Sequence, residues 1–149
     1  MTLTIAFYKG RADDPWGRVK DWAIRKATGG KYSHAELIEG RADLGAQARC
    51  LSASSRDGGV REKTIHLTPG HWDLVEMPID PTEAAGFIRQ RIGMRYDWRG
   101  VFLSQVLAFG GHNKRRWFCS EIIAAALDME RPNRISPQML FDILAYTSH

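Results

Sequence analysis

The sequence predicts an α+β fold, with strands in the first half of the chain and helices in the second half. The first half holds short stretches rich in β-branched and aromatic residues, separated by turn residues. The second half holds apolar stretches that begin near Asp-Pro or Ser-Pro pairs or end at glycines, as helices do. No repeat or linker divides the chain, so residues 1–149 are predicted to form a single domain.

The first predicted strand covers residues 2–8, and a helix is predicted to follow it. Asp14 is the expected N-cap, Pro15 the first helical residue, and Gly29-Gly30 the end of the helix. The apolar residues of this helix recur at roughly helical spacing, so one face is expected to pack on the sheet. These residues are Trp16, Val19, Trp22, Ala23 and Ile24.

Four further strands are predicted, at residues 32–40, 49–55, 61–67 and 72–79. The segment Arg56-Asp57-Gly58-Gly59 is a predicted turn, because glycine adopts a positive φ at little cost. The connections are short, and short connections favour antiparallel pairing.

Four helices are predicted after these strands. The first begins at the capping sequence Asp80-Pro81-Thr82-Glu83 and ends at residue 91 or 92, before a glycine. The others cover residues 100–109, 119–129 and 138–146, and Ser136-Pro137 is the expected cap of the last one.

Composition argues against several classes of function. A hydrophobic fraction of 44% and a charged fraction of 26% are typical of a globular protein, and no apolar run is long enough to span a membrane. The N-terminal sequence lacks the features of a secretion signal, so we expect a cytoplasmic protein. The net charge is +4, but the basic residues are dispersed, which argues against dedicated nucleic-acid binding.

The two cysteines, Cys50 and Cys119, are too few for a disulfide framework or a four-cysteine zinc site. His34-Ala35-Glu36 matches the first half of the zinc-deaminase signature, but the second half, Pro-Cys-x-x-Cys, is missing. The chain also has no His-Glu-x-x-His, Walker loop or Gly-x-Ser-x-Gly sequence. We therefore expect no metal and no cofactor.

Cys119 is a candidate nucleophile because it opens a predicted, very apolar helix. The start of a helix carries a partial positive charge, which favours the thiolate form of a cysteine. Free cysteines are also among the most frequently buried residues. Position alone therefore leaves two interpretations open, a nucleophile or a small core residue.

His34 is the candidate base among the five histidines. It begins a predicted strand, where alternation places His34 and Glu36 on one face. A strand can hold a general base rigidly, although a partly exposed strand histidine with no catalytic role is the alternative. The other histidines occupy positions that suit structural or surface roles: His66, His71, His112 and His149.

A third residue should orient the base. If the strand of His34 pairs with the next strand, Ser52 and Ser54 lie opposite His34, and neither is a carboxylate. Glu36 is the nearest charged residue, although residues two apart on a strand rarely hydrogen-bond. Asp57 is a second option, but it is first interpreted as a turn residue.

Four segments occur in a characteristic order: YSHAELI, RDGGV, YDW and FCSEIIAAAL. In these segments the chain resembles the circularly permuted papain-like amidases of the NlpC superfamily, of the YiiX/YaeF type. The resemblance covers roughly residues 1–129. It implies an antiparallel sheet packed against helices, with the histidine strand before the cysteine helix.

The resemblance implies that Cys119 is the nucleophile and His34 the base. The third residue of the family is usually a polar histidine or glutamate on the strand after the catalytic histidine, where this chain has Ser52 and Ser54. The predicted catalytic residues are therefore Cys119 and His34, with Glu36 and Ser52 as candidates for the third position.

The implied activity is hydrolysis of an amide bond through a thioester on Cys119. The expected substrate is a peptide, as in cell-wall fragments, or a lipid-linked acyl group. Two alternatives stay open: an acyltransferase or thioesterase of the same fold, and a catalytically silent papain-like module that binds a partner or serves in a phage structure. The small size suits a phage or bacterial intracellular protein.

Overall fold

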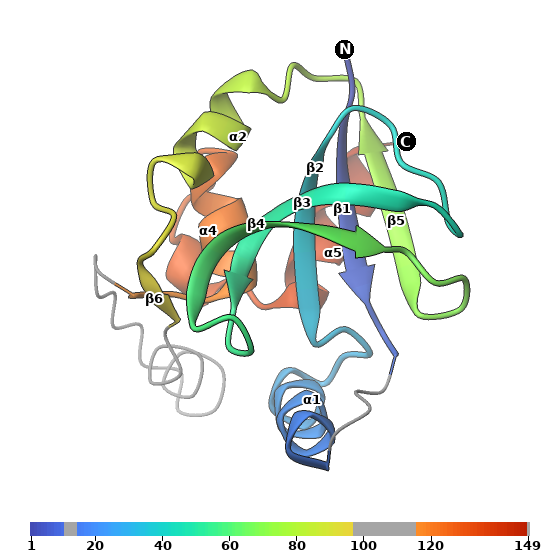
Figure 1. Cartoon of the computed structure of the whole chain (residues 1–149), viewed down its shortest axis with the longest axis vertical. Helices are drawn as coiled ribbons and strands as arrows, with labels where there is room; N and C mark the ends of the chain where they lie inside the picture. The colour runs from blue at the N-terminus through green and yellow to red at the C-terminus, as the bar shows by residue number, and fades with distance from the viewer. Residues whose placement is uncertain (11–14, 97–115, 149) are drawn as a thin grey trace.

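A sheet of seven strands organises the part of the chain that the structure, a computed structural model, describes: residues 1–10, 15–96 and 116–148. The strand order is β5-β1-β2-β3-β4-β6-β7, and every neighbouring pair is antiparallel except β6 and β7 (Figure 1). The strands are β1 (Leu3–Tyr8), β2 (His34–Glu39), β3 (Gln47–Ser54), β4 (Gly59–His66), β5 (Trp72–Met77), β6 (Arg95–Tyr96) and β7 (Arg116–Trp117). The predicted α+β class is confirmed.

The five longer strands lie where the sequence predicts them, with ends that differ by one or two residues. The two short strands β6 and β7 are not predicted, because two residues are too few for alternation to be visible. The predicted turn before β4 is confirmed, and Gly58 adopts a φ of +81° there. Gly59 allows β4 to approach β6, since a Cβ at this position would lie 1.8 Å from the carbonyl oxygen of Met94.

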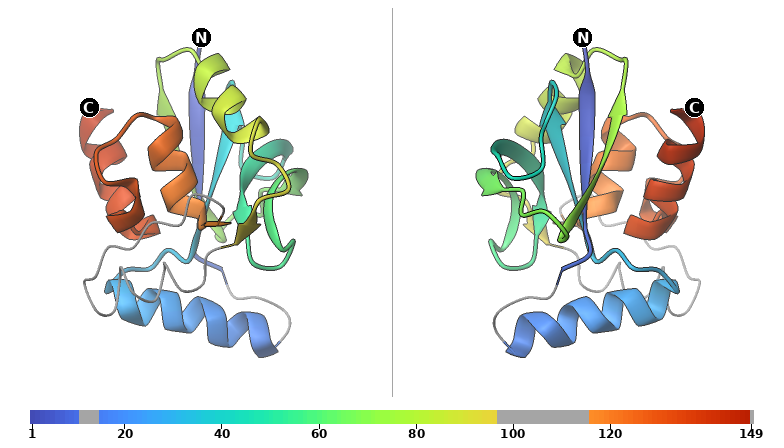
Figure 2. Two further views of the ribbon diagram at one scale, coloured as in Figure 1. Left: turned by 90° about the vertical axis from the view of Figure 1, so that its left-hand side faces the viewer. Right: turned by 90° about the vertical axis from the view of Figure 1, so that its right-hand side faces the viewer.

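Three helices cover one face of the sheet, namely α2 (Thr82–Arg89), α4 (Cys119–Ala126) and α5 (Pro137–Thr147). Alternate residues of the strands face these helices and form the main core with them. The core includes Leu3, Ile5, Phe7, Leu37 and Leu51 from the strands, and Ile88, Ile122, Ile123 and Leu140 from the helices. The β3–β4 hairpin curves away on the opposite side of the sheet from α4 and α5 (Figure 2). It covers a smaller apolar cluster there, which includes Ala6, Ile38, Cys50, Leu67 and Trp72.

The predicted packing of the first helix on the sheet is wrong. This helix, α1 (Pro15–Thr28), lies beyond one end of the strands (Figures 1 and 2). Val19 is 51% exposed and Trp22 is 65% exposed, whereas Ile24 is buried in a small cluster with Phe118. The apolar face of the sheet is already covered by α2, α4 and α5, which leaves α1 the end of the sheet. The expected cap at Asp14 and the side chain of Trp16 lie outside the described residues.

Helix ends follow the predicted signals only in part. The N-cap of α2 is Pro81 rather than Asp80, because the first helical hydrogen bond runs from the N–H of Ala85 to the carbonyl of Pro81. The Asp80 carboxylate still accepts from the backbone N–H of Thr82 at 3.0 Å. The α4 helix ends at Ala126, earlier than predicted, and Asp128 then adopts a left-handed φ of +57°.

The predicted cap of α5 is confirmed, since the Ser136 hydroxyl accepts from the backbone N–H of Met139 at 3.1 Å. A short 3-10 turn, η1 (Pro132–Arg134), precedes this helix. The helix predicted at residues 100–109 lies outside the described residues.

Candidate functional site

Tertiary packing brings Cys119 to His34, although the two residues are far apart in the sequence. His34 is the first residue of β2, and Cys119 is the first residue of α4. Buried Ile122 and Ile123 anchor α4 in the core against β2 and β3, which fixes the start of the helix. Cys119 lies close enough to the His34 ring to contribute to raising the pKa of His34.

Glu36 supports His34 from the same strand. The His34 Nε2 atom lies 2.6 Å from Oε1 of Glu36, and the Glu36 side chain is fully buried. The expectation that residues two apart on a strand do not hydrogen-bond is wrong at this position. Of the two candidates for the third residue, Glu36 is therefore the one in contact with His34, and it comes from the strand of the histidine itself.

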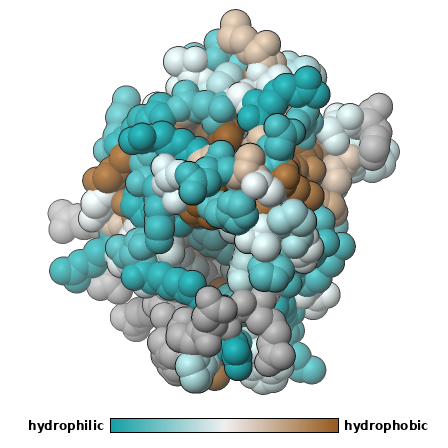
Figure 3. Space-filling view, turned by 45° about the vertical axis from the view of Figure 1, so that its right-hand side comes forward, coloured by the Kyte–Doolittle hydropathy of each residue, from teal (hydrophilic) through white to brown (hydrophobic). Residues whose placement is uncertain are grey.

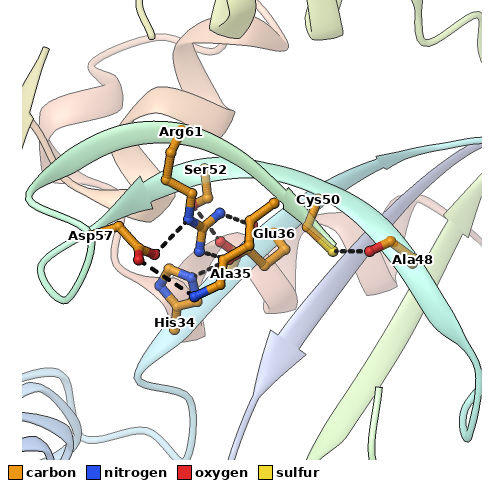
Figure 4. A network of polar contacts seen from close by, with 9 residues as sticks. His34, Ala35, Glu36, Ala48, Cys50, Ser52, Asp57 and Arg61 are labelled. Atoms are coloured by element: carbon orange, nitrogen blue, oxygen red, sulfur yellow. Dashed lines mark hydrogen bonds and ion pairs between the residues drawn. The ribbon is translucent and has the colours of Figure 1, made fainter. Parts of the chain in front are cut away.

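Arg61 of β4 holds the other side of the Glu36 carboxylate (Figure 4). Its Nη1 donates to Oε2 of Glu36 at 2.7 Å, and its Nη2 donates to Oε1. The Nε of Arg61 donates to Oδ2 of Asp57 at 2.9 Å, and Lys63 Nζ lies 3.4 Å from Asp57 Oδ1. These contacts form a continuous charged chain that runs from His34 to Lys63.

The charges in this chain set the protonation states of His34 and Glu36. Burial would lower the pKa of His34, but the charge of Glu36, and after it the neighbouring Cys119, outweigh burial and raise this pKa to about 10. Burial would raise the pKa of Glu36, yet His34 and Arg61 hold it below its usual range. At neutral pH the site therefore contains an imidazolium beside a carboxylate.

Ser52, the other candidate for the third residue, lies close to this chain and bonds to the backbone of β2. It is fully buried on β3, and its hydroxyl donates to the backbone carbonyl of Ala35 at 2.6 Å. This bond directs the hydroxyl proton of Ser52 to the backbone of β2. Ser52 therefore ties β3 to β2 just beside the site.

A cavity of about 370 Å³ opens beside His34, Glu36 and Arg61. Residues from several elements complete its lining, including Tyr8, Asp21, Ile24, Asp57, Lys63 and Trp72. The face of the molecule drawn in Figure 3 is largely hydrophilic, with apolar residues in a band across its upper half. Cys119 is only 1% exposed and is not among the lining residues, so His34 is the member of the pair that meets the cavity.

Sequence reasoning missed Arg61 altogether and considered Asp57 only as a turn residue that could serve as a third partner. One signal was available for Arg61. In the observed register, Arg61 pairs with Ser52, and the β2–β3 register, continued by one pair, sets Ser52 opposite Glu36. A three-strand alignment of the sequence would therefore have placed an arginine across from the buried glutamate.

Metal sites and membrane-spanning helices were considered for the described residues, 1–10, 15–96 and 116–148. Among them, no group of three or more His, Cys, Asp or Glu side chains is arranged to hold a metal ion. No helix in this part of the chain is long and apolar enough to cross a membrane.

Comparison with known proteins adds no family assignment. The sequence matches no family model, and a search of the curated proteins found no significant match. The geometry around Cys119 and His34 is therefore the basis for any functional argument.

Proposed function

We propose that this chain is a cysteine hydrolase that cleaves an amide bond, built on a circularly permuted papain-like fold. One observation carries the proposal: a buried helix begins at a cysteine near enough to His34 to influence its pKa, and His34 in turn contacts the buried Glu36. A nucleophile, a base and an orienting acid are the three groups that thiol hydrolysis uses.

The strand and helix order supports the choice of fold. The histidine strand β2 precedes the cysteine helix α4 in the chain, and α4 packs across β2 and β3. This is the order that the resemblance to permuted NlpC-type amidases implies.

The raised pKa of His34 suggests the resting state of the pair. With a pKa of about 10, His34 is protonated at neutral pH, and its charge favours a thiolate on Cys119. The helix start adds a second positive influence on the sulfur.

The proposed reaction has two halves. The Cys119 thiolate attacks the amide carbonyl, the C–N bond breaks, and the His34 imidazolium gives its proton to the departing amine. A water molecule then attacks the thioester, His34 takes its proton, and the carboxylic acid leaves as the Cys119 thiolate is restored. The backbone N–H of Cys119 at the helix start can hold the developing oxyanion in both halves, while Glu36 stays ionised and orients His34.

The proposed substrate is a peptide or an acyl-amide, such as a cell-wall peptide or a lipid-linked acyl group. The cavity beside His34 is lined by both acidic and basic side chains, including Asp21, Asp57 and Lys63, so net charge alone does not select the substrate. An acyltransferase or thioesterase would use the same thioester and differ only in the group that accepts or carries the acyl chain.

A specific observation favours a second candidate function, a catalytically silent papain-like module that binds a partner. The Cys119 side chain is almost fully buried, and the cavity reaches His34 rather than the sulfur. A silent module would keep this geometry as part of its core without admitting a substrate to the thiol.

Alkylation by iodoacetamide separates the two candidates. The rate at Cys119 would be followed by peptide mass spectrometry from pH 5 to 9, in the wild type and in His34→Ala. A hydrolase should be alkylated well below pH 8, and His34→Ala should abolish that reactivity. Cleavage of fluorogenic amide and ester libraries would then identify the bond. The hydrolase proposal would be contradicted, and the silent module favoured, if Cys119 reacts like an ordinary thiol or stays unmodified in the native protein.

A further inference from the structure

Arg61 reaches across the sheet to a carboxylate that is already engaged by His34. Its side chain is 14% exposed, and the Glu36 carboxylate beneath it is fully buried. Oε1 of Glu36 is shared, since it faces Nε2 of His34 and also accepts from Arg61. The position of this one oxygen is therefore set from two sides.

The guanidinium of Arg61 is itself fixed at two points. Nη1 and Nη2 form a two-pronged contact with Glu36, and Nε is held by Asp57 in the turn before β4. Because the guanidinium is planar, bonds on two of its edges prevent it from rotating. Lys63 is a second cation beside Asp57, and this ion pair helps to hold the Asp57 carboxylate in place against Arg61.

We propose that Arg61, oriented by Asp57, is a positioning residue that acts through Glu36 to aim His34 at Cys119. This inference rests on the proposed hydrolase function. A glutamate on the histidine's own strand must be turned along that strand to meet the ring, and Arg61 supplies the cross-strand contact that turns it. Arg61 touches neither the thiol nor the reacting bond in this role.

The alternative is that Arg61 is only a structural link between β2 and β4, and the chain contains a matched control for that role. Arg89 of α2 donates to Glu39 of β2 and to Glu62 of β4, with Nε of Arg89 at 3.1 Å from Glu62. Arg89 therefore bridges carboxylates of the same two strands, but it is more exposed and is not among the residues that line the cavity.

The test compares Arg61→Met, Arg61→Lys and Asp57→Asn with Arg89→Met in the full chain. Two readouts are used: the NMR titration of the His34 ring, and the pH profile of Cys119 alkylation by iodoacetamide. In Arg61→Met we expect the Glu36 carboxylate to lose its position against the ring, so that the His34 pKa falls and the acid limb of alkylation moves to higher pH, each by roughly one pH unit or more. Loss of the Arg61 charge by itself would raise the His34 pKa, so the direction of the shift separates the two effects. Arg61→Lys keeps the positive charge but loses the two-pronged contact with Glu36, so its His34 pKa and alkylation profile should lie between those of Arg61→Met and the wild type. Asp57→Asn should give a smaller shift in the same direction, and Arg89→Met should give none.

Arg61→Met leaves Glu36 with one cation fewer and could unfold the protein, so the double variant Arg61→Met/Glu36→Gln is included. If Arg61 acts through Glu36, the double variant should alkylate no more slowly than Glu36→Gln alone. Slower alkylation in the double variant would overturn the inference, because Arg61 would then act by another route. The inference would also be overturned if Arg61→Met is folded and its His34 pKa is unchanged or higher than in the wild type.

The proposed function fails by a different result. If wild-type Cys119 reacts as an ordinary thiol at every pH, the hydrolase proposal fails, whatever the variants do. If wild-type Cys119 is activated and Arg61→Met leaves both profiles unchanged, only the role of Arg61 is lost.

Discussion

The Nε2 atom of His34 and Oε1 of Glu36 lie 2.6 Å apart, although the two residues are next-but-one neighbours on a single strand. In the proposed site, the carboxylate of Glu36 comes from the same strand as His34, and we infer that further contacts hold it against the ring. Arg61 and Asp57 provide that support from β4 and the turn that precedes it. The candidate site thus depends on two layers of charged contacts, and the predictions below test them separately.

Glu36→Gln should weaken the site while leaving the fold in place. Without the carboxylate, the pKa of His34 should fall from about 10 toward 6.5, and Cys119 alkylation at pH 7 should fall by roughly 10²-fold. The NMR titration of His34 and the alkylation rate check both effects. Glu39→Gln is the matched control, because Glu39 lies on the same strand with an exposed side chain. An unchanged His34 titration in Glu36→Gln would contradict the proposed role of the carboxylate.

The two cysteines should differ in reactivity. Burial, followed by the nearby charge of Glu36, raises the pKa of Cys50 to about 12, so its thiol should resist alkylation in the native protein at pH 7. Peptide mapping after brief treatment with iodoacetamide should find the label on Cys119 alone. Cys50→Ser should leave the alkylation rate of Cys119 unchanged. Faster labelling of Cys50 would be the opposite of what this geometry predicts.

Ser52→Ala should affect stability and not the pH profile. Its hydroxyl donates to the carbonyl of Ala35 in the interior, and loss of such a bond costs about 1 kcal/mol of unfolding free energy. Urea denaturation measures this loss. The NMR titration of His34 should match the wild type, and a His34 pKa displaced by more than roughly half a pH unit would give Ser52 a direct part in the site.

Stability should depend on pH in a defined direction. The pKa of His34 is raised from 6.5 to about 10 on folding, so the folded state holds more protons over this range. The stabilisation from the pair is therefore complete below 6.5 and is lost as the pH rises toward 10. Glu36 has a lowered pKa, so its contribution is present above its usual value of 4.5 and is lost as the pH falls further.

Urea denaturation of the wild type and of Glu36→Gln at a series of pH values tests this dependence. The difference in unfolding free energy between the two proteins should be largest between about pH 4.5 and 6.5 and should shrink toward pH 10. A difference that grows as the pH rises through this range would mean that His34 is not stabilised as an imidazolium in the fold.

Local patterns in the sequence predicted the five long strands, the helices α1, α2, α4 and α5, and the positions of His34 and Cys119. The five long strands follow from alternation and turn residues, and the α5 cap follows from Ser136 before a proline. The same patterns place His34 at the start of a strand and Cys119 at the start of a helix, whereas the resemblance to permuted papain-like amidases is what singles them out as a pair. These features depend on residues close together in the chain, and the sequence displays them directly.

Contacts between distant elements were decided only by the tertiary structure. One side of α1 is exposed because α2, α4 and α5 already cover the apolar face of the sheet. The short strands β6 and β7 form because each has a neighbouring strand to pair with. The bond from Arg61 to Glu36 depends on the register of β2, β3 and β4 and on the curl of the β3–β4 hairpin. Side-chain alternation tells which face a residue occupies, but it does not tell which residue of another strand it will meet. The pair of Cys119 and His34 could therefore be named from the sequence, whereas what holds His34 in place required the fold.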